Sequence, residues 1–512
     1  MAYLRRSFRK PPLPGADDAC KILACREVAG YAYEHFSRSV RIPIPFRQCS
    51  GNLSTTSLVP MFESMKMFHD SPLRDLFGVL PRAAHVSALA ALVGVMAGSA
   101  SALFLVALDL ATDTRLIHPW LLWLLPVAGF AVGWIYLRLG ASVEAGNNLL
   151  IDEIHDPQRV VPLRMAPLVL VSTVVTHLFG GSAGREGTAV QMGGALADQL
   201  THVFRLSGEQ RRVLLMSGIA AGFASVFGTP LAGAVFGLEV LAIGRLRYDA
   251  LLPCLVAALV GDAVTRAWGV HHTAYMIAPG LFTASMSLSG AFSAAVAGVL
   301  CGLTGMAFAQ ATHATSAFMK RRIAYAPLRP VAGGVLVAAA ATALGTPQYL
   351  GLGIPTIVDA FHTTLPWYDF LGKALFTVVT LGSGFKGGEV TPLFYIGATL
   401  GNALSHVLTL PAAVLAGIGF VAVFAGAANT PIASTLMAIE IFGPQIGGYA
   451  AIACVLAYLC SGHTGIYRAQ RVGHGKHGAV PEGMRLADLP AWRKSLGAGR
   501  RAAEDAQDTR RR

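Results

Sequence analysis

Charged side chains are scarce in this chain. Asp, Glu, Lys and Arg make up 13% of its 512 residues, whereas they make up about 25% of an ordinary soluble domain. Hydrophobic residues make up 54%. Apolar stretches close to the roughly 20 residues that an α-helix needs to cross a bilayer recur between residues 86 and 461. This composition excludes an ordinary soluble protein and predicts an all-α membrane protein, a bundle of several spanning helices.

Cysteine is also scarce, and its seven residues are scattered along the chain without a CxxC spacing. An odd number without that spacing indicates neither a disulfide framework nor a zinc site, and the histidines lack metal-ligand spacing as well. Residues 382–387 satisfy the pattern GxGxxG, but no alternation of strands and helices surrounds them, so they do not indicate a dinucleotide site. We therefore predict neither a metal nor a cofactor.

Basic residues concentrate at the two ends, outside the apolar region. They are Arg5, Arg6, Arg9 and Lys10 at one end, and Arg493, Lys494, Arg500, Arg501 and residues 510–512 at the other. A net charge of +12 can indicate nucleic-acid binding, but in a membrane protein basic flanks mark cytoplasmic segments. We predict no nucleic-acid partner, and a multi-pass protein of a bacterial-type inner membrane with both termini in the cytoplasm.

The ends also differ from the middle in pattern. Residues 1–82 are polar, and no apolar stretch follows their basic start, so they show no signal peptide. We expect a disordered tail there, or a true start downstream at Met61, Met65 or Met67. Residues 468–512 predict a short basic cytoplasmic tail.

The membrane region between these tails contains an internal repeat. Thr229-Pro230-Leu231-Ala232 corresponds to Thr430-Pro431-Ile432-Ala433, an offset of 430 − 229 = 201 positions. Further matches follow in order at nearly this offset: Gly184 with Gly388, Gly193 with Gly397, Gly218 with Gly419, Glu239 with Glu440, and Gly146-Asn147-Asn148 with Gly351-Leu352-Gly353. The repeat divides the region into related halves, 83–270 and 271–467.

Repeated halves with glycine-interrupted apolar segments are typical of transporters whose site lies at the repeat interface. Irregular backbone at membrane depth is tolerated only where it is buried in protein or lines a cavity. We therefore expect discontinuous helices, with the glycine clusters marking the site.

The stretch Gly180 to Thr188 joins two apolar runs and contains Glu186. A turn of this kind leaves backbone N–H groups unpaired at a helix start, which makes an anion site. A carboxylate there competes with the anion when ionised and leaves when protonated. The plainer alternative is that Glu186 is only a structural partner of Arg185, although an ionisable residue at membrane depth is by default a functional hypothesis.

These motifs resemble the CLC family of chloride channels and anion/proton exchangers. The resemblance rests on Gly184-Arg185-Glu186-Gly187-Thr188, on Gly387-Gly388-Glu389-Val390-Thr391-Pro392 and on the related halves, and it covers about residues 82–467. It implies a homodimer with one pore per subunit, inverted-topology halves, and helix N-termini that converge on a central anion beside Gly184, Arg185 and Gly187.

Four departures from the usual family pattern narrow the resemblance. The loop Gly146-Asn147-Asn148 has Asn147 where most of the family has a Ser that binds the anion, and Thr188 replaces a Pro. Val390 replaces a Phe, and the inner proton-relay glutamate of the chloride/proton exchangers would fall at Val240. Together they resemble the fluoride/proton antiporter branch of the family.

Membership of that branch implies further roles. Glu186 would gate the external side, Glu389 and Thr391 would help to route the proton or the anion inward, and Tyr467 would be a central tyrosine. Two alternatives remain open from the residues alone: Glu389 as a first-turn Glu that complements a helix dipole, and Tyr467 as an aromatic residue of the membrane interface.

Three functions remain for comparison. Fluoride is small and strongly hydrated, so it requires firm hydrogen-bond donors, and the Asn147 amide supplies two where a hydroxyl supplies one. This favours fluoride/proton exchange gated by Glu186; the alternative is a chloride channel or chloride/proton exchanger. An intramembrane serine protease using Ser182 and His177 would have no use for the repeat, so we predict that the protein is not an enzyme.

Overall fold

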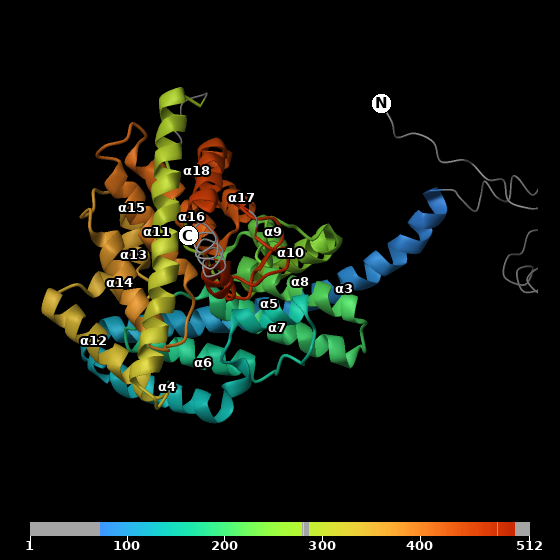
Figure 1. Ribbon diagram of the computed structural model, residues 1–512, viewed down its shortest axis with the longest axis horizontal. Helices are drawn as coiled ribbons and strands as arrows, with labels where there is room; N and C mark the ends of the chain where they lie inside the picture. The colour runs from blue at the N-terminus through green and yellow to red at the C-terminus, as the bar shows by residue number, and fades with distance from the viewer. Residues whose placement is uncertain (1–71, 279, 281–285, 479, 497–512) are drawn as a thin grey trace, which may run out of the picture. The chain divides into compact units, whose positions relative to one another are not determined.

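The computed structural model describes residues 72–278, 280, 286–478 and 480–496. The alternative starts at Met61, Met65 and Met67 lie outside the described residues. The first helix, α3, spans Pro72–Ile117 and so begins inside the segment predicted as a tail. Figure 1 shows the first half of the chain in blue to green and the second half in yellow to red.

Each half contributes eight α-helices within the described chain. The first half has α3 Pro72–Ile117, α4 Leu125–Leu139, α5 Asn147–His155, α6 Met165–Leu178, α7 Glu186–Val203, α8 Gly208–Phe227, α9 Pro230–Glu239 and α10 Leu251–Ala267. The second has α11 Leu288–Arg322, α12 Leu328–Leu344, α13 Ile354–Asp359, α14 Asp369–Gly382, α15 Val390–Leu404, α16 Ala412–Ala428, α17 Pro431–Phe442 and α18 Gly447–Cys460. The predicted all-α fold with discontinuous helices is confirmed, and α3–α10 correspond in order to α11–α18.

Contacts between α9 and α17 run in both directions. The Glu239 carboxylate at the end of α9 accepts hydrogen bonds of 3.0 and 2.8 Å from the N–H groups of residues 432 and 433 at the start of α17. Glu440 on α17 accepts two hydrogen bonds of 2.8 Å from residues 231 and 232 at the start of α9. Each carboxylate satisfies N–H groups that have no partner within their own helix. The two helices are therefore antiparallel, as inverted-topology repeats require.

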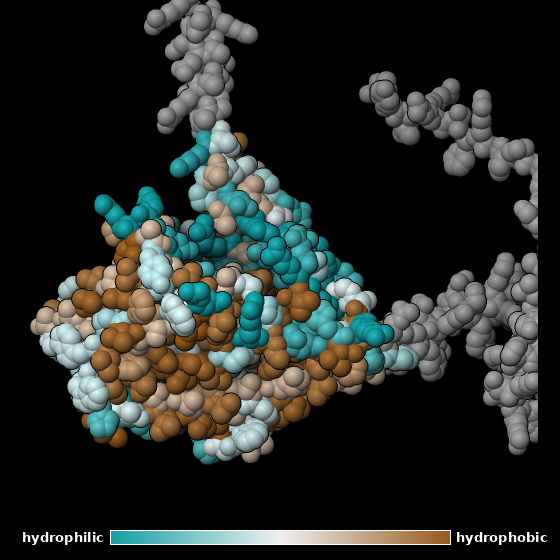
Figure 2. Space-filling model, turned by 90° about the horizontal axis from the view of Figure 1, so that it is seen from below, coloured by the Kyte–Doolittle hydropathy of each residue, from teal (hydrophilic) through white to brown (hydrophobic). Residues whose placement is uncertain are grey.

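Four helices of the described chain are long and apolar enough to cross a membrane: Ala83–Ile117, Pro119–Leu139, Tyr248–Ala267 and Leu288–Arg322. Several shorter apolar helices accompany them. Figure 2 shows a broad hydrophobic area beneath a hydrophilic region on one face. Exposed apolar side chains over this extent suit contact with lipid, so the chain is a multi-pass membrane protein.

Some of the repeated glycines serve helix packing. A Cβ atom on Gly193 of α7 would lie 2.2 Å from Gly218 O of α8, and one on Gly397 of α15 would lie 2.0 Å from Gly419 O of α16. Small residues let helix backbones approach closely inside membranes. The expectation that repeated glycines mark the site thus holds only for those in the turns; these four hold helix pairs together.

The segment after Tyr467 packs against the membrane domain. Strand β2, Arg471–Val472, pairs in parallel with β1, Ala242–Ile243. Leu486 and Leu489 pack with Val472 and Ile243 in a small hydrophobic cluster. The described part of the predicted tail, up to residue 496, is therefore folded onto the first half.

Replacing Arg211 by Met is expected to destabilise the fold strongly. Arg211 on α8 binds Asp198 of α7 through Nε (2.6 Å) and Nη2 (3.0 Å), and its Nη1 lies 3.3 Å from Glu153 of α5. Removing this cation leaves two buried carboxylates unpaired, which costs about 3–5 kcal/mol. The measurement is the apparent melting temperature of the detergent-solubilised protein.

The matched control is Arg245→Met, because the Arg245–Glu482 pair is exposed on both sides and such pairs contribute about 0–1 kcal/mol. Equal melting temperatures for the two variants would show that the buried cluster does not hold the three helices together.

Candidate anion-binding and gating site

The starts of α7 and α15 meet at a short antiparallel contact. Gly184 N donates to Gly388 O at 2.6 Å, and Gly388 N donates to Gly184 O at 2.7 Å. A Cβ atom on Gly388 would lie 2.8 Å from Gly187 N, so the turns approach more closely than a side chain there allows. Because Gly184 and Gly388 are repeat mates, the contact lies where the two halves are related to each other.

Glu186 is the first residue of α7 and is 0% exposed. Its Oε2 accepts hydrogen bonds from Thr391 N (3.0 Å) and Arg185 N (3.1 Å), and its Oε1 accepts one from the Thr391 hydroxyl (2.5 Å). Thr391 lies in the first turn of α15, where N–H groups lack intrahelical partners and attract anions. The carboxylate therefore occupies a place on α15 that an anion can take.

The Arg185 side chain contributes less to holding this carboxylate. Its Nε lies 3.6 Å from Glu186 Oε1 and has no hydrogen-bond partner among the residues described. The Arg185 side chain is therefore not the main partner of the Glu186 carboxylate, which is held more closely by the two hydrogen bonds from Thr391.

The equivalent position in the second half differs. Val390 is the first residue of α15, as Glu186 is of α7, and it is 1% exposed. Its side chain has no polar atom, so it can neither bind a proton nor compete with an anion. Of these two equivalent first positions, Glu186 carries a carboxylate and Val390 does not.

The start of α5 reaches the same place. A Cβ atom on Gly187 would lie 3.1 Å from Asn147 Nδ2, so the Asn147 amide faces the turn that carries Glu186. The Asn147 Oδ1 atom is buried and has no hydrogen-bond partner in the described chain. Gly146 precedes it with φ 59°, and a Cβ atom there would lie 3.2 Å from Gln191 Nε2. The unpaired atom is an acceptor and can take a hydrogen bond from water or another donor, whereas the Nδ2 group is the part of the amide that can bind an anion.

The Asn148 side chain makes a contact with the segment after Tyr467 that the sequence did not indicate. Its Oδ1 accepts a hydrogen bond of 2.9 Å from Ala469 N, two residues after Tyr467. This hydrogen bond uses the side-chain oxygen and ties the α5 loop to the segment that carries Tyr467. The amide NH₂ is the part of Asn148 that can bind an anion, as the resemblance predicts.

Tyr467 is held by a network of backbone contacts. Ile466 N donates to Ala427 O at 2.9 Å, and the Gln470 Nε2 donates to Val240 O (2.9 Å) and Ala428 O (2.8 Å). The tyrosine itself is 3% exposed. A side chain this buried does not fit the alternative of an aromatic residue at the membrane interface.

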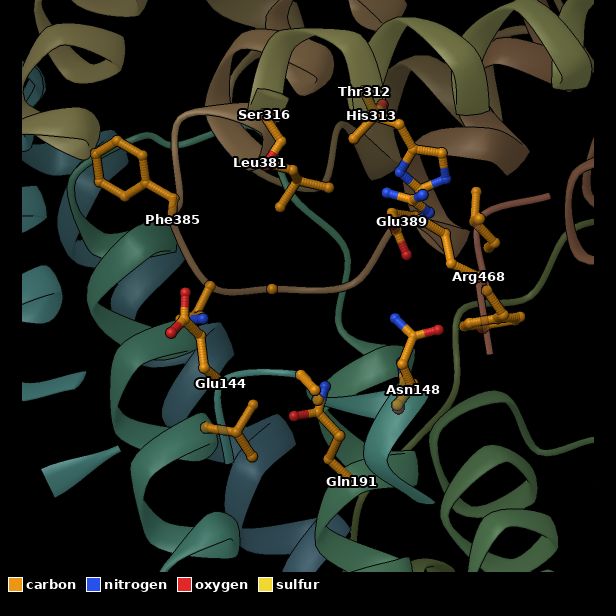
Figure 3. A pocket seen from close by; sticks show the side chains of 18 of the residues that line it. Glu144, Asn148, Gln191, Thr312, His313, Ser316, Leu381, Phe385, Glu389 and Arg468 are labelled. Carbon is orange, nitrogen blue, oxygen red and sulfur yellow. The ribbon is translucent and has the colours of Figure 1, made fainter. Parts of the chain in front are cut away.

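A cavity of about 390 Å³ lies on one side of this site. Figure 3 shows Gln191 and Asn148 on one wall, Thr312, His313 and Ser316 of α11 on the opposite wall, and Glu389 with Arg468 between them. Gly146, Asn147, Lys386 and Tyr467 also line it. The predicted residues Asn147, Glu389 and Tyr467 therefore border one polar space, although they are far apart in the sequence.

The lining residues that the sequence reasoning missed include Gln191, Lys386, Arg468 and Glu144. Gln191 interrupts an apolar run, and Lys386 lies in a glycine-rich loop at membrane depth with its Nζ 4.1 Å from the centroid of the Tyr136 ring. Polar or charged residues in such segments are candidates for function, so this signal was available for both. Glu144 and Arg468 lie in stretches whose sequence gives no such contrast.

The protease alternative has no geometric support. The Ser182 hydroxyl lies 2.9 Å from the Thr377 hydroxyl. The His177 ring nitrogens lie 2.8 and 2.9 Å from the carbonyl oxygens of Thr173 and Ala183. No Ser–His pair forms between these two residues.

Comparison with known proteins identifies the family. A description of the family "Voltage gated chloride channel" matches residues 128–462. The chain belongs to the CLC family. CLC proteins are channels and transporters, so the expected resemblance is confirmed.

Individual CLC relatives extend this result. The chain is 64% identical over 418 residues to a "Chloride/fluoride channel protein" of Pseudomonas syringae pv. tomato, covering 80% of this chain and 92% of that one. It is 29% identical over 391 residues to the "H(+)/Cl(-) exchange transporter ClcA" of Vibrio vulnificus, covering 69% and 81%. The solved structure of "a CLC-type fluoride/proton antiporter" matches with a TM-score of 0.73 and 34% identity, covering 76% of this chain and 98% of that chain.

Proposed function

We propose that the protein exchanges fluoride for protons across the membrane, with Glu186 as its gate. The observation that carries this proposal is the pair of hydrogen bonds from Thr391 N and the Thr391 hydroxyl to the Glu186 carboxylate. A carboxylate of one half thereby occupies anion-binding donors of the other half.

Protonation of Glu186 changes this balance. The ionised carboxylate forms charge-assisted hydrogen bonds with Thr391, and these are about twice as strong as neutral ones. A neutral carboxylic acid holds the two donors less firmly, so an anion can displace it. Proton binding and anion binding are then linked, and each turnover moves one in exchange for the other.

The cavity of Figure 3 supplies the route on the inner side. Glu389 is the N-cap residue of α15, two residues before Thr391, and borders this cavity together with Tyr467. We propose that Glu389 passes the proton between Glu186 and the cytoplasm, and that Tyr467 lines the anion path. In this proposal the anion path also includes Gly146, Asn147, Asn148, Gly184, Arg185, Gly187, Val390 and Thr391.

Fluoride is favoured over chloride by the donor at the α5 start. The Asn147 amide offers two N–H donors where a serine offers one hydroxyl, and a small anion with concentrated charge gains most from additional donors. The names of the 64% identical relative and of the matching antiporter structure also mention fluoride. Chloride/proton exchange is the second candidate, because more distant relatives carry that name.

The remaining parts of the proposal concern assembly and placement. We propose a homodimer in a bacterial inner membrane with both termini in the cytoplasm. The basic residues at both ends support this orientation.

Reconstitution into liposomes tests the proposal. Vesicles loaded with fluoride are expected to release it once the membrane potential that opposes anion efflux is dissipated, and a fluoride electrode follows the release. Chloride is expected to leave far more slowly. A fluoride gradient should drive proton movement against the proton gradient, as followed with a pH-sensitive dye.

Protein-free vesicles give the baseline, and dissolving the vesicles with detergent gives the total content. Equal efflux rates for the two anions would contradict fluoride selectivity and favour chloride/proton exchange as the function. Fluoride release without proton movement would indicate a channel.

A further inference from the structure

Two basic side chains converge on Gly351, in the loop before α13. Lys373 on α14 is 0% exposed, and its Nζ donates hydrogen bonds to Tyr349 O (3.0 Å) and Gly351 O (2.6 Å). Arg115 on α3 also reaches this loop, because a Cβ atom on Gly351 would lie 3.1 Å from its Nη2. Two like charges therefore meet at one backbone residue and repel each other.

No carboxylate neutralises these cations in the part of the chain that the structure describes. Neither Arg115 nor Lys373 forms an ion pair there. Asp369, one turn before Lys373 on α14, accepts the Tyr349 hydroxyl at 2.7 Å. The Arg115 Nε is buried without a hydrogen-bond partner among the described residues. Buried charges are normally paired because an uncompensated one is costly, so this pair has the properties of an anion site.

A neutral donor lies in the same region. Tyr395 on α15 is 0% exposed, and its hydroxyl is buried without a hydrogen-bond partner in the described chain. Its ring centroid lies 5.3 Å from Lys373 Nζ. A buried hydroxyl without a partner calls for an explanation such as a bound ion or water. Two cations and one hydroxyl thus leave donor capacity unused in one region.

The repeat relates this cluster to the anion loop of the first half. Gln191 and Tyr395 are each the sixth residue of their helix, α7 and α15. Gly146 and Gly353 are the N-cap residues of α5 and α13, both with positive φ. A Cβ atom on Gly353 would lie 2.7 Å from the Tyr395 ring, as one on Gly146 would lie 3.2 Å from the Gln191 amide. The cluster is therefore the second-half counterpart of the loop that carries Asn147.

The cluster also adjoins the turn that carries Glu186. A Cβ atom on Gly180, where that turn begins, would lie 3.6 Å from Arg115 Cδ. Because the halves are inverted, the counterpart of the loop beside the cavity of Figure 3 lies on the other side of the gate. An anion held here is next to the gating turn without passing through that cavity.

We infer that Arg115, Lys373 and Tyr395 form a second binding site for a small halide ion, separate from the donors that hold Glu186. The inference rests on the proposed function only for the class of ligand. The site provides a waiting position for an anion on the side of the gate opposite to the cavity.

Isothermal titration of the purified full-length chain with sodium fluoride tests the inference. Arg115→Gln and Lys373→Gln are each expected to bind one fluoride fewer than the wild type. If the site still fills, its affinity for fluoride is expected to fall about tenfold, since one charge-assisted donor typically contributes that much. A parallel titration with sodium chloride shows which halide the site takes. Arg138→Gln is the matched control, because Arg138 lies against the ring of Trp134 away from the cluster.

Unchanged stoichiometry and affinity in Arg115→Gln overturns the inference. If the fully buried Lys373→Gln does not fold, as judged by size-exclusion chromatography, the partly exposed Arg115 decides the question alone. Loss of proton coupling in the wild-type liposome assay would contradict the proposed function without affecting this binding result, so the two failures are distinguishable.

Discussion

Glu186→Gln is expected to abolish proton movement driven by a fluoride gradient. Glutamine matches glutamate in size, so it can stay near Thr391, but it cannot release a proton at any physiological pH. Val390 at the equivalent helix start carries no proton either, and the Val240 position is likewise apolar. Coupling therefore depends on Glu186, and the dye signal in liposomes should fall to that of protein-free vesicles.

A partly buried carboxylate elsewhere provides the control for this result. Glu440 accepts hydrogen bonds from N–H groups at a helix start, as Glu186 does, but at the contact of α17 with α9. Glu440→Gln is expected to retain proton coupling in folded protein. Proton pumping that persists in Glu186→Gln would mean that a different residue is the gate.

Asn147→Ser is expected to reduce the preference for fluoride over chloride by roughly 10- to 100-fold. The change removes one donor to a charged ligand, and a hydrogen bond to a charged group contributes about 1.5–3 kcal/mol. Chloride, with its charge spread over a larger radius, loses less from the same change. The measurement is the ratio of initial fluoride and chloride efflux rates from liposomes of the same preparation.

Asn148→Ala separates selectivity from positioning. Because the Asn148 side chain holds the segment of Tyr467 through Ala469 N, we expect this variant to slow both anions while leaving their ratio unchanged. A ratio that stays at the wild-type value in Asn147→Ser would remove Asn147 from the account of selectivity.

Several features of the fold followed from short stretches of sequence. The apolar runs predicted membrane helices, and the Thr-Pro motifs at 229 and 430 predicted two related halves. In the structure these motifs begin the equivalent helices α9 and α17. Hydropathy and sequence repeats can be recognised in the sequence without knowing which residues are in contact in the folded protein. The roles of Asn148 and of Gly193 were not predictable in this way, because their partners lie in other elements.

The candidate site shows the same division. Its turn and its carboxylate were visible at Glu186, since a glycine-rich turn with one ionisable residue stands out in an apolar sequence. The cluster of Arg115, Lys373 and Tyr395 was not visible, because three isolated residues on separate helices form no pattern. The fold brings them together, and among the described residues no carboxylate pairs with the two basic side chains.

The sequence by itself determined the class of the protein, its repeat and its family resemblance, and it led us to propose Glu186 as the gate. The tertiary structure alone decided which groups hold that residue. Thr391, whose N–H and hydroxyl bind the Glu186 carboxylate, is 205 residues away in the chain. Contacts over such separations depend on how the two inverted halves pack, and no local pattern of residues encodes that geometry.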